Sequence, residues 1–338
     1  MRQNVEDALQ GKSTGTIATG PLAVHYCAAL EEVSIRRYTT DAQTLADSVI
    51  RYYERFRPDA VWLSADTWVS AQAMGAAVDF TADNQPMGGT GEPAVRTIDD
   101  VRRIPMPDPN GQGRYPMMLE ALRRIVDAIG DRAYIVACFD QYPFSLAAAL
   151  MGVDQIMLAI YDDRTLVESL MDRCREYAVA YARALGEAGA DMLSGGDSPA
   201  GLIGPELYAE LAMPAERQTI EEIKAGFNGP VSLHICGDAT AISPVMDQAG
   251  ADVLEIDQRV DLACAFQSVS PQTAIWGNLD PVALLAQGSV DDVKRETRRA
   301  IETFKASGHR RFVLSSGCTL AVETPPENLE AMLTVAKE

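Results

Sequence analysis

The sequence has few positive charges, few aromatic residues and only three histidines. Its 29 Lys and Arg residues stand against 48 Asp and Glu residues, which gives a formal net charge of -19 at pH 7. Nucleic-acid binding depends on Lys and Arg side chains that neutralise phosphates, so this charge balance argues against a nucleic acid as partner. It argues equally against docking on an anionic membrane surface.

Long hydrophobic runs and a paired cysteine framework are also absent. The longest apolar stretch, residues 143–153, falls well short of the roughly 20 residues that a membrane-spanning helix needs. The opening MRQNVEDALQGK lacks the apolar core of a secretory signal. The six cysteines show no paired spacing, and a chain of 338 residues needs no disulfides to build a core. We therefore expect a reduced, soluble, cytoplasmic protein.

The chain repeats one pattern, a short apolar run that ends in a polar residue and precedes a helical stretch. Eight such runs are predicted strands: residues 16–24, 60–66, 134–140, 191–197, 231–237, 252–257, 273–280 and 311–318. Residues 162–189 and 290–308 have apolar residues at helical spacing and end in Gly. Eight alternating units predict an α/β fold, a single (β/α)8 TIM barrel over residues 1–338. There is no G-x-G-x-x-G motif to favour an open dinucleotide-binding sheet.

One connection is much longer than the others. Between Asp66 and Tyr134 the chain contains QPMGGTGEP (85–93) and PMPDPNGQGRYP (105–116). We predict a long Gly/Pro-rich insert after the second strand. Such segments are either functional lids or ordered surface loops, and both interpretations stay open.

A histidine and a cysteine lie two residues apart in the run PVSLHICGD, at His234 and Cys236. On a strand such residues share a face, and in isolation they would be ordinary core residues. In a TIM barrel, however, the C-terminal strand ends meet at one mouth, and Cys318 ends the last predicted strand. The three residues are therefore a candidate ligand set with one open position, the pattern of catalytic zinc.

Several strand-end carboxylates are further candidates. Asp257 ends the strand after the one that bears His234, and it is the predicted fourth metal ligand; Glu255, on the same strand face, and water are the alternatives. Asp66 and Asp197 are candidate catalytic residues that orient substrate or zinc ligands. For each of these two, capping of the helix that follows is the alternative.

Three segments, LHICGDAT, GNLDP and SSGCTLAVETPPENLEAM, resemble the uroporphyrinogen decarboxylase superfamily. They are most similar to its zinc-dependent corrinoid methyltransferases, of the methylcobamide:coenzyme M methyltransferase type. The resemblance extends through VWLSADTWVSAQAMG (61–75), PFSLAAALMG (143–152) and GGDSPAGLIGPE (195–206). It implies a (β/α)8 barrel, zinc ligands at His234, Cys236 and Cys318, and an acidic ligand at Asp257.

The same resemblance implies an activity. A methyl group would pass between a small substrate and the cobalamin of a separate corrinoid protein. The substrate would be a thiol acceptor such as coenzyme M, or a methylated donor such as a methoxyarene. A non-catalytic, zinc-stabilised docking factor for a corrinoid protein is an alternative, but an open coordination position favours an enzyme.

Uroporphyrinogen decarboxylase itself is the rival within the superfamily. The resemblance would place its catalytic aspartate at Asp66 and its serine at Ser198. Decarboxylases carry an arginine-bearing segment near the N-terminus that grips substrate carboxylates, whereas this chain has ATGPLAVHYCA (18–28) there. Cys318 also stands where the decarboxylases have a histidine. The methyltransferase is therefore the preferred interpretation.

Overall fold

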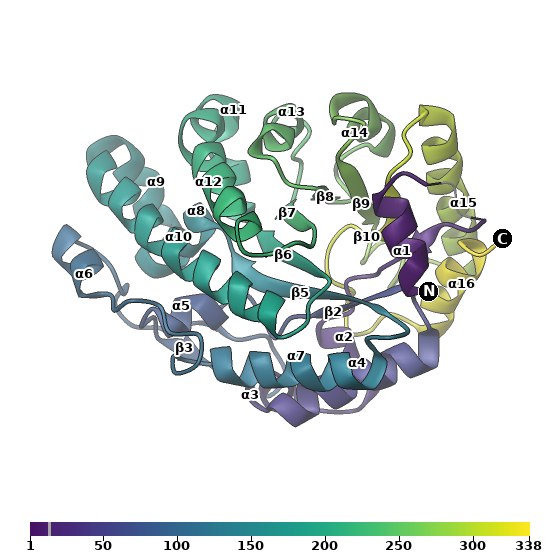
Figure 1. The fold of residues 1–338 in the computed structure, drawn as a ribbon, viewed down its shortest axis with the longest axis horizontal. Helices are drawn as coiled ribbons and strands as arrows, with labels where there is room; N and C mark the ends of the chain where they lie inside the picture. Colours follow the sequence, from purple (N-terminus) through teal and green to yellow (C-terminus); the bar gives the residue numbers. More distant parts are fainter. Residues whose placement is uncertain (13–14) are drawn as a thin grey trace.

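Eight parallel strands form the centre of the protein. The computed structural model describes residues 1–12 and 15–338. The strand order is β1-β10-β9-β8-β7-β6-β5-β2. The strands are β1 (Ala18–Thr19), β2 (Ala60–Leu63), β5 (Tyr134–Gln141), β6 (Met192–Gly196), β7 (Val231–Ile235), β8 (Val253–Ile256), β9 (Ala274–Leu279) and β10 (Phe312–Ser316). The sheet curls into a nearly closed barrel with helices around it, which confirms the predicted (β/α)8 fold (Figure 1).

Helices cover the outside of this barrel. The longer ones are α1 (Arg2–Leu9), α4 (Ala42–Phe56), α7 (Tyr115–Ile129), α8 (Pro143–Met151), α9 (Val153–Asp162), α10 (Arg164–Glu187), α12 (Met213–Lys224), α15 (Val290–Ser307) and α16 (Pro326–Val335). The shorter ones are α2 (His25–Leu30), α3 (Ile35–Thr40), α5 (Val69–Ala73), α6 (Ile98–Arg103), α11 (Gly204–Leu207), α13 (Ser243–Met246), α14 (Leu262–Ser268), η1 (Ser198–Leu202), η2 (Tyr208–Ala212) and η3 (Asp247–Ala249).

Capping residues set the ends of the two helices that the sequence predicts most clearly. The Asp163 side chain accepts a hydrogen bond from the backbone N–H of Leu166 and begins α10. Ser289 and Asp292 form a reciprocal capping box at the start of α15. Gly308, at φ 76°, ends α15 in the left-handed conformation that glycine adopts without strain. Both predicted helices are confirmed.

The first strand is shorter than predicted. The sequence suggests a strand over 16–24, but only Ala18–Thr19 is extended and paired. Just beyond it, the indole N–H groups of Trp62 and Trp276 donate to the carbonyl oxygen of Gly20, at 3.1 and 2.9 Å. A Cβ on Gly20 would lie 2.2 Å from the Trp276 ring. Because the two indole N–H groups occupy the Gly20 carbonyl oxygen, it is not free to accept a backbone N–H from a neighbouring strand, and the strand ends before it.

Packed side chains fill the barrel at the N-terminal ends of its strands. Buried side chains from many strands form one cluster inside the barrel, among them Trp62, Val136, Met192, Trp276 and Val313. Val5 and Leu9 of α1 belong to the same cluster and pack against it from the N-terminal side of the strands. The C-terminal strand ends therefore remain available for a pocket.

The long connection between β2 and β5 carries structure of its own. It contains α5, α6, α7 and an antiparallel pair of β3 (Val78–Asp79) and β4 (Met87–Gly88). The first Gly/Pro-rich segment runs through β4, and the second leads into α7. Within the second segment, the Gln112 side chain accepts from the backbone N–H of Asp108 at 2.6 Å and donates to the Met106 carbonyl at 3.1 Å.

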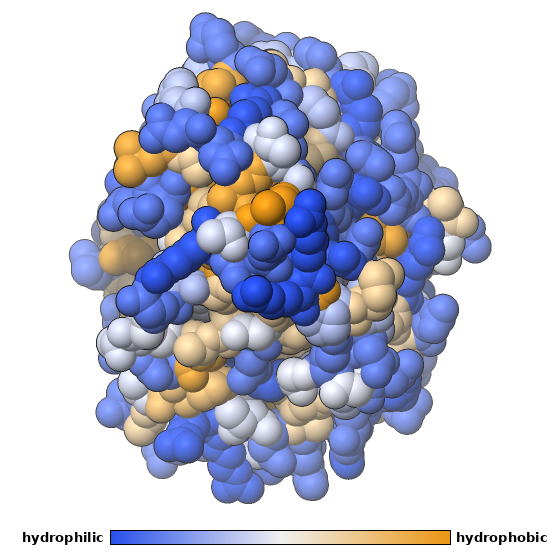
Figure 2. Space-filling view, turned by 90° about the vertical axis from the view of Figure 1, so that its left-hand side faces the viewer, coloured by the Kyte–Doolittle hydropathy of each residue, from blue (hydrophilic) through white to orange (hydrophobic). Residues whose placement is uncertain are grey.

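The face that carries α6 and α9 is largely hydrophilic, with apolar side chains gathered near its centre (Figure 2). On α9, Leu158 and Tyr161 are exposed. In residues 1–12 and 15–338 no single helix is long and apolar enough to cross a membrane. Helices α8 and α9 pass that test only as a pair, by length and composition, and they meet at 107°.

Candidate metal centre and substrate pocket

Three side chains at the C-terminal mouth of the barrel place their ligand atoms within 4.8 Å of one another: His234, Cys236 and Cys318. His234 lies in β7, Cys236 just beyond it, and Cys318 just beyond β10. The two sulfurs are 3.8 Å apart, and His234 Nε2 lies 2.9 Å from the sulfur of Cys236. Residues separated by 82 positions in the chain are thus brought together, as the strand-end argument predicts.

The spacing of the cluster fits a tetrahedral metal ion. Two thiolates bound to zinc at ~2.3 Å with tetrahedral angles lie about 3.8 Å apart, which matches the distance between the two sulfurs. His234 Nδ1 lies 3.0 Å from the carbonyl oxygen of Glu255, so Nδ1–H donates there and Nε2 faces the sulfurs. Such a hydrogen bond orients the ring of a metal-bound histidine. The donor set and the separation of the two sulfurs fit zinc with one position open.

Hydrogen bonds link the three side chains and shift their pKa values. The hydrogen bond with Cys318 lowers the pKa of Cys236, whereas the same bond together with burial raises the pKa of Cys318 to about 12. Burial disfavours the charged imidazole of His234, but its contact with Cys318 and the charge of Glu255 outweigh burial and raise its pKa to about 9. A zinc ion held here would require two thiolates and a neutral imidazole, so its binding would release these protons.

The two carboxylates considered as a fourth ligand are engaged elsewhere. Asp257 accepts backbone N–H groups with both oxygens, from Gly237 and from Arg259, each at 2.8 Å. Glu255 is buried, and its Oε1 accepts from the hydroxyls of Ser194, at 2.8 Å, and Ser232. Among the described residues, the ligand group contains neither carboxylate. The structure therefore brings together three of the four ligands named from the sequence.

A cavity of ≈ 490 Å³ opens beside the cluster, and His234, Cys236 and Cys318 form part of its lining. Its walls are mostly apolar and include Trp62, Trp68, Leu22, Val24 and Val153, the last at the junction of α8 and α9. Carboxyl groups and hydroxyls lie among these apolar side chains. A pocket of this size and polarity is typical of small-molecule sites.

Asp140 is the unexpected member of this lining. It lies in β5 at φ 81°, a backbone region that residues with a side chain rarely adopt. Its Oδ2 accepts the backbone N–H of Ser70 at 2.8 Å, while Oδ1 has no hydrogen-bond partner among the described residues. Burial raises the pKa of Asp140 to about 7. Asp140 is the last residue of the predicted strand 134–140, but the sequence pattern assigns no role to its side chain.

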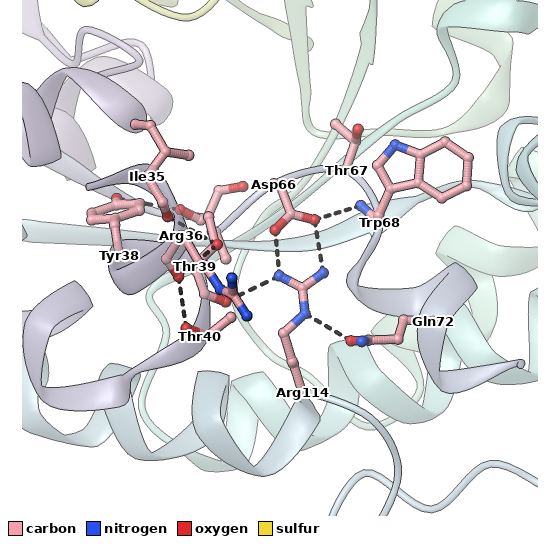
Figure 3. Close-up of polar contacts among 12 residues, drawn as sticks. Ile35, Arg36, Tyr38, Thr39, Thr40, Asp66, Thr67, Trp68, Gln72 and Arg114 are labelled. Atoms are coloured by element: carbon pink, nitrogen blue, oxygen red, sulfur yellow. Dashed lines mark hydrogen bonds and ion pairs between the residues drawn. The ribbon is translucent and has the colours of Figure 1, made fainter. Parts of the chain in front are cut away.

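Asp66 is held by an arginine that the sequence does not single out. The guanidinium of Arg114 meets both carboxylate oxygens of Asp66, one of them at 2.9 Å, and both side chains are buried (Figure 3). Arg114 also donates to Gln72 at 2.8 Å and to the Thr39 carbonyl at 3.1 Å. The backbone N–H of Trp68 donates to Asp66 as well. Asp66 is not among the pocket-lining residues and joins the barrel to the end of the insert.

Asp197 lies behind the pocket rather than in it. Its side chain is fully buried and accepts the backbone N–H of Ser145 at 2.7 Å, near the start of α8. Its backbone N–H donates to the carbonyl of His234 at 2.8 Å. Burial raises the pKa of Asp197 to about 6 and that of the neighbouring Glu216 well above its usual value; Glu216 also accepts the hydroxyl of Tyr208. Asp197 thus supports the strand that carries His234.

The family model described as uroporphyrinogen decarboxylase (URO-D) matches residues 2–338. The chain belongs to the URO-D family. Within that family it is 31% identical over 281 residues to the methylcobamide:CoM methyltransferase MtbA of Methanosarcina acetivorans, covering 82% of this chain and 79% of the relative. It is 28% identical over 302 residues to the methylcobamide:CoM methyltransferase MtaA of Methanosarcina barkeri, covering 88% and 85%.

Other URO-D relatives are decarboxylases. The uroporphyrinogen decarboxylase of Trichodesmium erythraeum is 27% identical over 312 residues, covering 90% of this chain and 85% of the relative. Among solved structures, a methyltransferase from Methanosarcina mazei superposes with a TM-score of 0.88 at 24% identity, over 99% of this chain and 97% of that one. The two proteins thus share one fold over almost the whole of both chains.

Proposed function

We propose that this URO-D family protein is a zinc-dependent methyltransferase that moves a methyl group between a small substrate and the cobalamin of a partner corrinoid protein. The substrate is a thiol acceptor, such as coenzyme M, or a methylated donor, such as a methoxyarene. The observation that carries the proposal is the cluster of His234, Cys236 and Cys318 at the edge of a largely apolar pocket. The similarity to two methylcobamide:CoM methyltransferases supports it.

In this proposal the three clustered side chains hold the metal, and residues 1–338 act as one catalytic domain. Zinc, when bound, supplies a Lewis acid for a substrate heteroatom and lowers the pKa of a bound thiol. The Glu255 carbonyl keeps the His234 ring aimed at the cluster. The apolar walls exclude water from the reacting atoms. Free thiols at Cys236 and Cys318 suit a reducing compartment, so we place the protein in the cytoplasm.

Asp66 and Asp197, named as catalytic candidates from the sequence, act here as positioning residues. Asp66 fixes the insert through Arg114, and Asp197 supports β7 through its backbone and α8 through its side chain. The engagement of Asp66 by Arg114 also weighs against uroporphyrinogen decarboxylase, because the aspartate matched to that reaction is turned toward the insert. The pocket weighs against a purely non-catalytic docking factor, which would need none.

The absorbance of cobalamin tests the proposal directly. Zinc-loaded protein is mixed with methylcobalamin and a thiol, or with reduced cobalamin and a methoxyarene. One of the two mixtures should change its spectrum at a rate proportional to the protein, and Cys318→Ala should abolish the change. A docking factor would bind a corrinoid protein without any substrate-dependent change. Conversion of uroporphyrinogen to coproporphyrinogen would replace the proposal with the decarboxylase.

A further inference from the structure

We propose that the pocket takes an uncharged aromatic methyl donor, of the aryl methyl ether class, rather than an anionic thiol such as coenzyme M. This inference rests on the proposed function and names its substrate class. Three properties of the pocket support it: the sign of its ionisable groups, its size and walls, and one buried carboxyl oxygen that has no partner.

The ionisable groups that line the pocket are acids and thiols, apart from His234. Asp140 and Glu255 are the two carboxyls, and both are at least nine-tenths buried. Over residues 1–12 and 15–338, no Lys or Arg belongs to the lining. Arg114 is a nearby buried cation, and it is already bound to Asp66. A sulfonate brought into such surroundings would lose its hydration next to two acidic side chains, with no Lys or Arg in the lining to compensate.

The dimensions of the cavity favour a ring over a small aliphatic donor. Its volume is ≈ 490 Å³, and a methyl donor of two or three heavy atoms would leave most of that space unfilled. Trp62 and Trp68 contribute aromatic surface to the wall, and Val24 and Val153 contribute aliphatic surface. Aromatic rings pack favourably against such side chains through burial of apolar area and through ring–ring contacts.

One buried polar atom can fix the orientation of such a ring. Asp140 belongs to the lining, and its Oδ1 makes no hydrogen bond within the described part of the chain. Buried polar atoms normally have partners, so a ligand that supplies a hydroxyl or an ether oxygen would satisfy it. Asp140 also holds a strained backbone conformation, as ligand-contacting residues often do. With a pKa of about 7, its carboxyl can either accept or donate.

Transfer of the methyl group from an aryl methyl ether requires one co-substrate, the cobalt(I) corrinoid of the partner protein. The bond between the methyl carbon and the ether oxygen breaks, and oxygen keeps the bonding pair. The methyl carbon forms a bond to cobalt, which supplies both electrons of that bond and is oxidised from cobalt(I) to cobalt(III). The phenolate oxygen takes a proton from solvent, so the products are a phenol and a methylated corrinoid.

Binding measurements without any corrinoid test the substrate class. Calorimetry on the zinc-loaded protein compares 2-methoxyphenol with its ring-sulfonated analogue, and 2-mercaptoethanol with coenzyme M, which differ only at their charged end. We expect the uncharged member of each pair to bind at least about tenfold more tightly, because like charges repel at short range in a partly desolvated pocket. Equal or tighter binding of the sulfonates overturns the inference, and so does tighter binding of tetramethylammonium than of 2-methoxyphenol.

Two variants in the pocket test whether its lining causes the preference for uncharged over sulfonated ligands. Asp140→Asn keeps an oxygen that can accept the Ser70 N–H, and asparagine tolerates a positive φ, so this variant should fold. The ratio of the affinity for the uncharged ligand to that for the sulfonate should fall several-fold. Asp131→Asn, a change at an exposed aspartate, should leave both affinities unchanged. Ala149→Lys, which adds a cation to the lining, should raise the affinity for coenzyme M. An unchanged preference in both pocket variants contradicts the inference.

The proposed methyl transfer and the proposed ligand preference of the pocket can be disproved separately. Methyl transfer observed only with coenzyme M would keep the proposed function and remove this inference. Selective binding of uncharged methoxyarenes without methyl transfer to cobalamin in either direction would keep the pocket preference and remove the proposed function.

Discussion

The carboxylate of Asp66 and the guanidinium of Arg114 form a buried, two-point ion pair that joins the C-terminal end of β2 to the last part of the long insert. Arg114 also lies over the ring of Phe80, with its guanidinium carbon 4.9 Å from the ring centre. Gln72 and the Thr39 carbonyl accept two further hydrogens of the guanidinium. The pair therefore anchors the insert to the mouth of the barrel.

Removing one partner should be costly. Arg114→Met leaves a buried carboxylate without its counter-charge, and we expect a loss of roughly 3–5 kcal/mol in the free energy of unfolding, measured with urea. The double variant Asp66→Asn/Arg114→Met should recover part of that loss, since the amide carries no charge and can still accept from Trp68. A loss below about 1 kcal/mol in the single variant would mean that the pair is effectively solvated.

Asp140 should make stability depend on pH. Its pKa is raised from 3.8 to about 7 in the folded protein, so the folded state holds a proton that the unfolded state releases between these values. The contribution of Asp140 to stability is therefore complete below about pH 4 and is lost as the pH rises through 7, by at most about 4 kcal/mol. Asp140→Asn should remove this part of the dependence. Unfolding curves at pH 4.5 and 8 that shift equally in both proteins would contradict the assignment.

Asp257 should contribute to the loop and not to the metal. Because both of its oxygens accept backbone N–H groups, Asp257→Ala should cost about 0.5–2 kcal/mol of stability and leave zinc content unchanged. Asp280→Ala is a control at another strand end, since Asp280 also accepts two backbone N–H groups, from Val282 and Ala283, with one of its oxygens. A change in the zinc X-ray absorption spectrum of Asp257→Ala alone would restore Asp257 as a ligand.

Periodicity and strand-end position predict the barrel and its three-residue cluster, because both follow from rules that act locally along the chain. His234 and Cys236 share a strand face by their spacing, and Cys318 joins them because parallel strands end at one mouth. The short first strand was not predicted, since its length depends on where Trp62 and Trp276 place their indole N–H groups. Those contacts arise between strands distant in the sequence.

The roles of the strand-end carboxylates depend on partners that no local pattern reveals. Asp66 binds Arg114, which lies 48 residues later in the chain. Asp140 has a raised pKa because it is buried, and it accepts the N–H of Ser70, which lies 70 residues earlier. Asp197 donates its backbone N–H to the His234 carbonyl, and Asp257 accepts the backbone N–H of Gly237, next to Cys236. Their residue types therefore indicated that these carboxylates lie at the mouth of the barrel, but they did not reveal the partners that each one binds.

Metal analysis of cysteine variants tests the central claim most directly. The protein purified from zinc-supplemented medium should hold about one zinc ion per chain, as expected for a single catalytic site. Cys236→Ala and Cys318→Ala should lose it while remaining folded, because the stability of the barrel comes from its packed interior. Cys138→Ala, which changes a cysteine in the same pocket but outside the cluster, should keep it. Full zinc occupancy in Cys318→Ala would contradict the account.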